Sequence, residues 1–302
     1  MKQVRILGVA IVAVLAIAAV AASTASAGLP EFGQCYAKSG GKYADSNCTT
    51  KAKKGTGTYE WRKLPDVTES KAFTGAGGTG TLTGHYEACV RGNKDPACSE
   101  EQINNEEASI LEASVECERE TAQGEESGTK EVKNVSVKFV GCKLFGTVPC
   151  SDSSVEGEIN VNQLKGKLGY IDKANKEVGI QLEPAVKKGE FVKFVCAGIV
   201  TTVVGVDGNT KTEGQPAYAG TGRDGIISPI APVDQMTHEL TQVYTINSEE
   251  ENIPSKFEGK PAELLESYVV NGEELAYRTA WSKAGETITN VNTSATEGEI
   301  KA

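Results

Sequence analysis

The sequence contains little of the chemistry that most enzymes and metal sites need. It has only two histidines, His85 and His238, and aromatic residues make up 6% of its 302 residues. Neither histidine belongs to a second ligand pattern, and no C-x-x-C pair or G-x-S-x-G turn occurs. A zinc site or a hydrolase nucleophile would require such partners. The sequence therefore predicts no catalytic residue, no metal ligand and no cofactor.

Long apolar runs are equally scarce, and the single one lies at the N-terminus. Lys2 and Arg5 precede the uncharged stretch 6–22, and Ala25-Ser26-Ala27 stands before Gly28. A short positive region, an apolar stretch and small residues are typical of a cleaved secretory signal. We expect residues 1–27 to be a signal peptide, with a retained membrane anchor as the alternative. After cleavage the chain is expected to have no membrane segment.

Basic residues are outnumbered by acidic ones, which leaves the chain with a net charge of −10. This balance disfavours nucleic acid and anionic lipid as partners, because both need a basic surface. Weak calcium binding stays open, with oxygen ligands available in Asp207-Gly208-Asn209 and Glu249-Glu250-Glu251-Asn252. Neither segment fits a twelve-residue EF loop, and a turn and a charged loop explain them equally well.

Cysteine is absent after residue 200, but eight cysteines precede that point. An even number in an exported chain predicts a disulfide framework outside the cytoplasm. Nearness along the chain favours three local pairs and leaves one pair of long range. The predicted pairs are Cys35–Cys48, Cys89–Cys98, Cys142–Cys150 and Cys117–Cys196.

Glycine is abundant, with 33 residues that separate short β-branched segments. Val135, Val137 and Phe139 alternate with polar residues, as in a half-buried strand. The segments 164–171 and 177–182 flank a five-residue polar loop and predict a hairpin. We expect an all-β fold with very little helix, an antiparallel β-sandwich or jelly roll. A β-helix is the alternative, although no short repeat supports it.

The chain divides into a lead-in and one body. Residues 28–66, with the Cys35–Cys48 loop, are predicted to form a small N-terminal lead-in. Residues 67–302 are predicted to form the sandwich body, within which 207–235, rich in glycine and proline, forms a long loop. The cysteine-free segment after 236 is expected to add strands to the same body, because it is short for a separate domain.

Several segments together resemble a group of uncharacterised exported proteins of soil actinobacteria. They run from Leu29-Pro30-Glu31-Phe32-Gly33-Gln34-Cys35 through Gly57-Thr58-Tyr59-Glu60-Trp61, Phe139-Val140-Gly141-Cys142, the stretch 164–171 and Phe194-Val195-Cys196 to Phe257-Glu258-Gly259. The resemblance covers most of the chain after the signal. It implies a bacterial extracellular protein and transfers no activity and no functional residue.

Paired carboxylates are the candidate catalytic groups. Glu116, Glu118 and Glu120 alternate with other residues and should share one face of a strand, and Glu87 could face the same way from a neighbouring strand. Glycosidases that use two acids need such a pair. An acidic, solvated face gives the same pattern. Glu87, Glu116 and Glu118 are the carboxylates named for the enzymatic alternative.

Two further motifs have structural explanations. Gly75-Ala76-Gly77-Gly78-Thr79-Gly80 matches G-x-G-x-x-G, but a strand rather than a helix is predicted to follow it, which favours a glycine turn over a dinucleotide site. Tyr59, Trp61 and Trp281 could stack on sugars, yet in a chain so poor in aromatic residues they are expected to anchor the core.

These observations predict a secreted or cell-envelope β protein without enzymatic activity. Its role would be to bind or to structure something outside the cell, with a glycan or a protein as the partner. A secreted glycan-active enzyme using paired carboxylates is the alternative function.

Overall fold

The computed structural model of the protein describes residues 28–64, 70–87, 110–152, 155–185, 190–197, 200–206, 225–248, 252–261, 265–271 and 282–302. Among these residues the regular elements are all β-strands, which confirms the all-β prediction. Within the same ranges no helix is long and apolar enough to cross a membrane. The predicted signal peptide, residues 1–27, lies outside the described residues.

Eight strands form a closed antiparallel barrel. In the order in which they pair, they are β3 (Lys71–Gly77), β6 (Arg119–Glu126), β7 (Glu131–Val140), β11 (Leu164–Asp172), β12 (Glu177–Pro184), β15 (Ile226–Ala231), β16 (Thr237–Ile246) and β21 (Ser282–Lys301). β21 then pairs with β3, with Asn292 opposite Gly75, so the sheet returns to its start. The predicted sandwich or jelly roll is therefore not what forms, because closure removes the two edges that would separate the layers. The β-helix alternative fails too, since every pairing is antiparallel.

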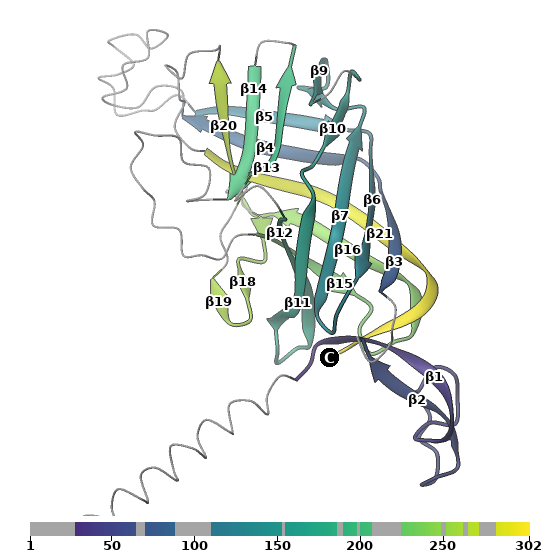
Figure 1. The fold of residues 1–302 in the computed structure, drawn as a ribbon. Helices are drawn as coiled ribbons and strands as arrows, with labels where there is room; N and C mark the ends of the chain where they lie inside the picture. The colour runs from purple at the N-terminus through teal and green to yellow at the C-terminus, as the bar shows by residue number, and fades with distance from the viewer. Residues whose placement is uncertain are drawn as a thin grey trace, which may run out of the picture.

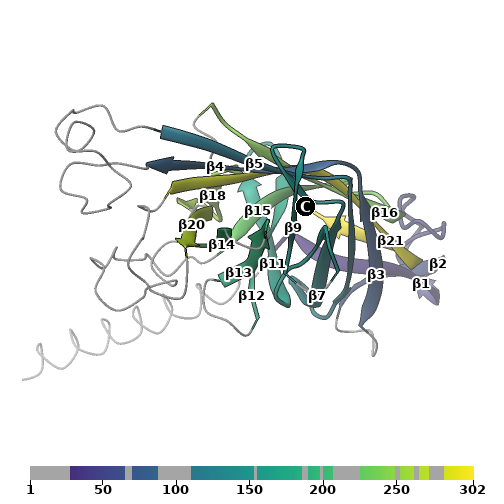
Figure 2. The same cartoon turned by 90° about the horizontal axis from the view of Figure 1, so that it is seen from above.

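The connections at one end of the barrel are long and contain most of the remaining strands. These are β4 (Gly80–Glu87), β5 (Ile110–Cys117), β8 (Lys143–Leu144), β9 (Val148–Ser151), β10 (Glu158–Asn160), β13 (Glu190–Cys196), β14 (Val200–Val206), β17 (Asn252–Ile253), β18 (Lys256–Phe257), β19 (Lys260–Pro261) and β20 (Leu265–Asn271). β4, β5, β8, β9, β13, β14 and β20 pair in that order, and β4 and β20 both pair with the first part of β21. They complete a second circuit above the barrel, in which β9, β13, β14 and β20 lie at the top of Figure 1. Seen from above, β4 and β5 extend away from the barrel (Figure 2).

Local sequence patterns explain several barrel strands. In β7 the alternation is confirmed: Val135 is buried, and Val137 and Phe139 pack against the core. The predicted hairpin is β11–β12. In its turn the Asp172 carboxylate accepts hydrogen bonds from the backbone of Ala174 and Asn175. Such Asx hydrogen bonding explains why this polar loop reverses the chain tightly.

One strand lies where a loop was predicted. Of the glycine- and proline-rich segment 207–235, residues 207–224 lie outside the described residues, but Ile226–Ala231 forms barrel strand β15. Ile226, Ile227 and Ile230 are buried, whereas Pro229 is exposed. Proline disfavours a central strand because it cannot donate to the ladder. The prolines therefore led to the prediction of a loop, although the isoleucines of this strand supply part of the core.

The disulfides differ in part from the predicted pairs. Cys35–Cys48 is confirmed. Cys117 is bonded to Cys142 and Cys150 to Cys196, so the predicted Cys142–Cys150 and Cys117–Cys196 pairs are wrong. The strand register decides the matter, since Cys150 on β9 lies directly opposite Cys196 on β13. Cys89 and Cys98 lie outside the described residues.

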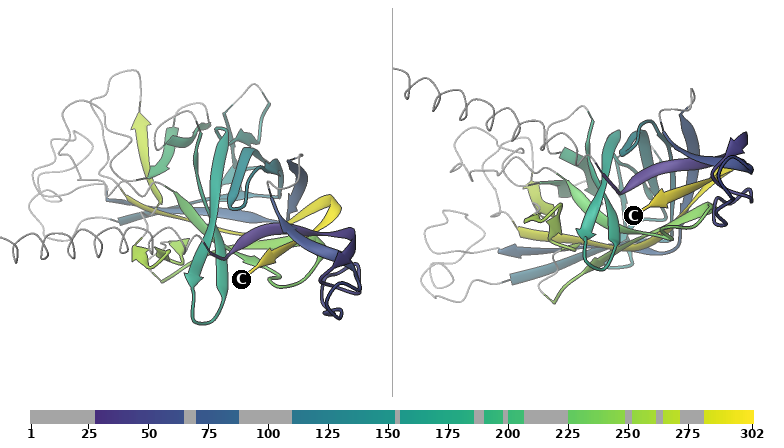
Figure 3. Two further views of the ribbon diagram at one scale, coloured as in Figure 1. Left: turned by 60° about the horizontal axis from the view of Figure 1, so that its bottom comes forward. Right: turned by 90° about the horizontal axis from the view of Figure 1, so that it is seen from below.

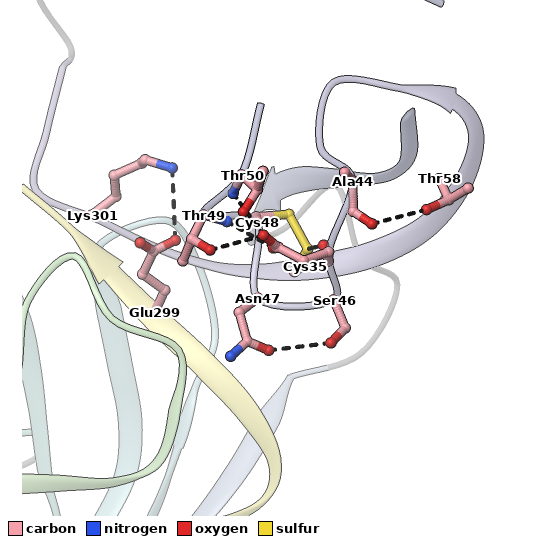
Figure 4. The surroundings of a disulfide bond; sticks show 11 residues. Cys35, Ala44, Ser46, Asn47, Cys48, Thr49, Thr50, Thr58, Glu299 and Lys301 are labelled. Carbon is pink, nitrogen blue, oxygen red and sulfur yellow. Dashed lines mark hydrogen bonds and ion pairs between the residues drawn. A yellow bond between two sulfur atoms is a disulfide. The ribbon is translucent and has the colours of Figure 1, made fainter. Parts of the chain in front are cut away.

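Residues 28–64 form a hairpin of β1 (Glu31–Gly41) and β2 (Gly57–Lys63) that extends away from the barrel (Figures 1 and 3). Only the start of β1 joins the barrel, where Glu31–Gly33 pairs with the end of β21. Phe32 there is 2% exposed and packs inside the lower end of the barrel. The hairpin is closed further out by the Cys35–Cys48 bond, shown in Figure 4.

Candidate functional site

A cavity of about 90 Å³ lies inside the protein where the barrel meets the second circuit. Most of its lining is aliphatic or aromatic. It comes from eight different strands and one connection, and consists of Leu82, Val115, Val137, Phe139, Ile159, Val161, Leu164, Leu182, Phe191, Val192, Phe194 and Ile226. The interior of an eight-stranded barrel is just wide enough for side chains or for one small ligand. Within the part of the chain that the structure describes, we take this cavity as the candidate ligand site.

The apolar lining ends on three polar side chains. Glu120 comes from β6, Tyr244 from β16 and Glu286 from β21. Glu120 is 4% exposed and Tyr244 7%. Glu286 keeps some accessible surface, which we attribute to the cavity that it lines, because protein surrounds it on all sides. An apolar pocket with few convergent polar groups is the usual form of a small-molecule site.

Glu120 reaches the interior because the strand changes phase just before it. Cys117 at the end of β5 and Glu120 in β6 are both buried although they are three residues apart. Regular alternation would place them on opposite faces. Glu118 lies between the end of β5 and the start of β6 and donates its backbone N–H to Val140 O at 2.9 Å. It is the one residue that breaks the alternation between the two strands. Because of this one irregular residue, the side chain of Glu120 points into the barrel, although regular alternation would place it on the outer face.

The two cavity carboxyls ionise at a higher pH than exposed glutamates do. Burial raises the pKa of Glu120 to about 7, although a hydrogen bond from Asn290 partly opposes the rise. Burial raises the pKa of Glu286 to about 8, and the neighbouring Glu120 adds to it. Burial, with the charge of Glu286 nearby, also raises the pKa of Tyr244 above its usual value. Low polarity and like charge both disfavour ionisation, which is why the three groups shift in the same direction.

Hydrogen-bonding capacity remains unused beside the cavity. Asn290 Nδ2 donates to Glu120 Oε1 at 2.6 Å, but Glu120 Oε2 is buried without a partner. The Oδ1 atoms of Asn290 and Asn292 are likewise buried and unpartnered. Buried polar atoms without partners are rare and costly, and a ligand or ordered water can satisfy them. The Glu286 carboxyl also makes no hydrogen bond to the described residues.

A polar chain continues from the cavity into the barrel. Asn292 Nδ2 donates to Gln242 Oε1 at 2.6 Å, and Gln242 Nε2 donates to Ser228 Oγ at 2.9 Å. Glycine makes the space for these side chains, since a Cβ on Gly75 would lie 2.5 Å from Asn292 Oδ1. The G-x-G-x-x-G motif thus joins β3 to β4, as the predicted turn between strands, and its glycines accommodate the polar interior.

The carboxylates named from the sequence do not form this site. Glu116 and Glu118 are exposed, and Glu118 makes a solvent-facing ion pair with Lys143 at 3.8 Å. Glu87 ends β4, but nothing is described of its side chain. Glu120, which the pattern placed on the same face as Glu116, is the only one of the four known to be buried. The sequence did not reveal Glu286 or Asn290 as site residues. Both lie on β21, where polar side chains face the interior and no hydrophobic alternation marks the inward face.

No protein-family model matches the chain, and no curated protein matches it. Two solved structures of the enduracididine biosynthesis enzyme MppR align with 76% of this chain at 9% and 8% identity. One is a complex with the condensation product of pyruvate and imidazole 4-carboxaldehyde, the other has HEPES buffer bound, and 88% and 86% of those chains are covered. Their TM-scores are 0.13 and 0.15. Similarity at this level establishes neither fold nor function.

The other candidate groups have local roles or lie outside the described ranges. The His238 ring nitrogen Nδ1 lies 3.0 Å from Ser294 O, and His85 stands in β4 without a described side chain. Trp61 lies against Lys301, whose Nζ is 4.5 Å from a ring centroid, and Trp281 is not described. Asn252 is buried and hydrogen-bonds the backbone of Glu286. The segments 249–251 and 207–209, where calcium binding stayed open, lie outside the described residues, and no metal-binding cluster occurs within the described ranges.

Proposed function

We propose that this protein is an exported binding protein without enzymatic activity, which holds a small apolar amine inside its barrel. The single observation that carries the proposal is the apolar cavity that ends on Glu120 and Glu286, two carboxyls with free hydrogen-bonding capacity. Export follows from the predicted signal peptide, and the disulfides are consistent with folding in an oxidising compartment.

The charge of the site favours an amine over an acid. When Glu120 and Glu286 are ionised they repel each other, and a carboxylate ligand would add a third negative group. An ammonium group would instead neutralise them and donate to Glu120 Oε2, which has no partner. Charge-assisted hydrogen bonds of this kind are among the strongest available in a dry site.

The size of the cavity favours a short ligand. An engineered apolar cavity of about 150 Å³ binds benzene, and the present cavity, of about 90 Å³, is smaller. We therefore expect a chain of a few carbon atoms bearing one amino group. A sugar chain fits neither the volume nor the apolar lining, which weighs against the glycan-active enzyme.

Calorimetric titration with short alkylamines, alkanols and alkanoates of equal length tests the proposal. The amine is expected to bind at least tenfold more tightly than the alcohol, and the alkanoate not measurably. Its affinity should rise from pH 6 to pH 8, because Glu120 and Glu286 ionise there and attract the ammonium group.

The matched variants are Glu286→Gln for the cavity and Glu116→Gln for the exterior. The first should abolish the preference for the amine, and the second should leave it intact because Glu116 is exposed. Equal affinity of the natural protein for amine and alkanoate would overturn the amine assignment. Absence of binding by all three series would overturn the binding function itself.

A further inference from the structure

The β1–β2 hairpin is basic although the chain as a whole is acidic. Residues 28–64 contain seven lysines and arginines and only three acids, whereas the whole chain carries a net charge of −10. The hairpin also extends away from the barrel, as Figures 1 and 3 show from different sides. The net charge of the whole chain therefore does not describe this part of the protein.

Four lysines of the hairpin surround one concavity, which we call the lysine cradle: Lys42, Lys51, Lys53 and Lys54. The concavity has a volume of about 370 Å³, and Tyr43 also lines it. The Lys42 side chain is 78% exposed, and its Nζ lies 3.8 Å from Glu60 Oε1, at the long end of the range for an ion pair. Lys51, Lys53 and Lys54 are exposed and make no ion pair with the described residues. Four like charges are thus gathered with little local neutralisation.

The loop that presents the lysine cradle is held in one shape. The Cys35–Cys48 bond closes it, and the Asp45 carboxylate accepts hydrogen bonds from the backbone N–H groups of Thr49 and Thr50 at 2.9 and 2.7 Å. Figure 4 shows both threonines beside the disulfide. Hydrogen bonds from Thr50 and Thr49 also hold the pKa of Asp45 well below its usual range. A preformed loop binds its partner with less loss of conformational entropy.

We propose that the lysine cradle binds an acidic polysaccharide, which would attach the protein to an anionic glycan outside the cell. Ammonium groups attract carboxylate or phosphate groups as point charges. Tyr43 is half-buried and lines the same concavity, and the Nζ of Lys301 lies over its ring, 5.8 Å from the centroid, so a further ammonium group stands beside the four lysines. A flexible chain can contact the hairpin alone, whereas a membrane or a rigid duplex would also meet the acidic barrel.

Affinity electrophoresis in gels containing polygalacturonate tests this with the full chain. The triple variant K51Q/K53Q/K54Q is expected to bind on the order of 100-fold more weakly, because each lysine near an anionic surface contributes roughly fivefold. The matched control K193Q/K256Q/K260Q removes the same charge from exposed positions of β13, β18 and β19 and should bind like the natural protein.

Competition separates the glycan from other polyanions. Single-stranded oligodeoxythymidylate and vesicles of anionic phosphatidylserine are expected to displace the protein from polygalacturonate only at much higher concentrations. Tighter binding to either probe would overturn the choice of a polysaccharide. Equal weakening by the two triple variants, or no binding of the natural protein to the gel, would overturn the site. Because the cradle lies outside the barrel, none of these outcomes depends on the cavity ligand.

Discussion

The free energy of unfolding is expected to fall as the pH rises from 5 to 8, and most of that fall is expected to vanish in the double variant Glu120→Gln/Glu286→Gln. In the unfolded chain both glutamates ionise near pH 4.3. In the folded protein they keep their protons until about pH 7 and about pH 8. Above pH 4.3 the unfolded state therefore binds fewer protons than the native state, and stability decreases with pH. Below that pH both states are protonated and the two carboxyls cost nothing.

The expected magnitude is several kcal/mol. A shift of one pKa unit corresponds to about 1.4 kcal/mol, so Glu120 alone accounts for roughly 4 kcal/mol once the pH exceeds its folded pKa. Glutamine has a similar shape, keeps an acceptor for Asn290 and cannot ionise. The double variant should accordingly be more stable than the natural protein at pH 8, and the difference should be much smaller at pH 5.

Urea unfolding at pH 5, 6, 7 and 8, with the disulfides intact, measures this difference. The control is the double variant Glu116→Gln/Glu118→Gln, whose exposed side chains should leave the pH profile unchanged. Glu126 is also buried, but it lies 3.8 Å from Lys71 and is present in all three proteins, so its contribution cancels. A natural protein as stable at pH 8 as at pH 5 would contradict the buried, protonated pair.

Removal of the Cys150–Cys196 bond in the variant Cys150→Ala/Cys196→Ala is expected to lower the free energy of unfolding by about 4 kcal/mol. The bond closes a sequence separation of 46 residues, and the entropy of an unfolded chain released from such a loop corresponds to about this value. Both sulfurs are also in the core, at 0% and 1% exposure, where alanine leaves space.

The control is Cys35→Ala/Cys48→Ala, which opens a separation of only 13 residues in the hairpin outside the barrel. It should change unfolding of the barrel much less, because β1 pairs with the barrel sheet only over Glu31–Gly33, before the disulfide-closed loop begins. Non-reducing peptide mapping of the natural protein supplies the independent measurement. A peptide linking Cys142 to Cys150 would contradict the arrangement of β9 and β13, since those strands place Cys150 opposite Cys196.

Sequence patterns predict the strands of this protein better than the way they join. The alternation of Val135, Val137 and Phe139 and the polar turn of β11–β12 are local properties, and both predictions are confirmed. Closure of the barrel is not local, because it depends on β3 pairing with β21 from the far end of the chain. Alternating strands bury one face in a sandwich as well as in a barrel, so the pattern alone does not distinguish them.

The candidate site was hidden for a different reason. Along β21, Asn290 and Asn292 face the interior while Thr289 and Thr293 face solvent, so both faces are polar and no hydrophobic alternation marks the inside. Glu120 was predicted to share the face of Glu116, and the irregular residue Glu118 reverses that phase. The glycines of β3 were a usable signal, because close approach of other side chains is one reason for glycine within a strand.

The 20-residue strand β21 pairs successively with β20 and β4, with β16 and β3, and finally with β1. The barrel, the second circuit and the hairpin therefore all depend on this one strand. A nascent chain can form its local hairpins early, but its contacts of longest sequence separation must wait, and such contacts make folding slow. The interior therefore stays open until β21 has paired with β3, so the cavity is among the last features of the protein to form.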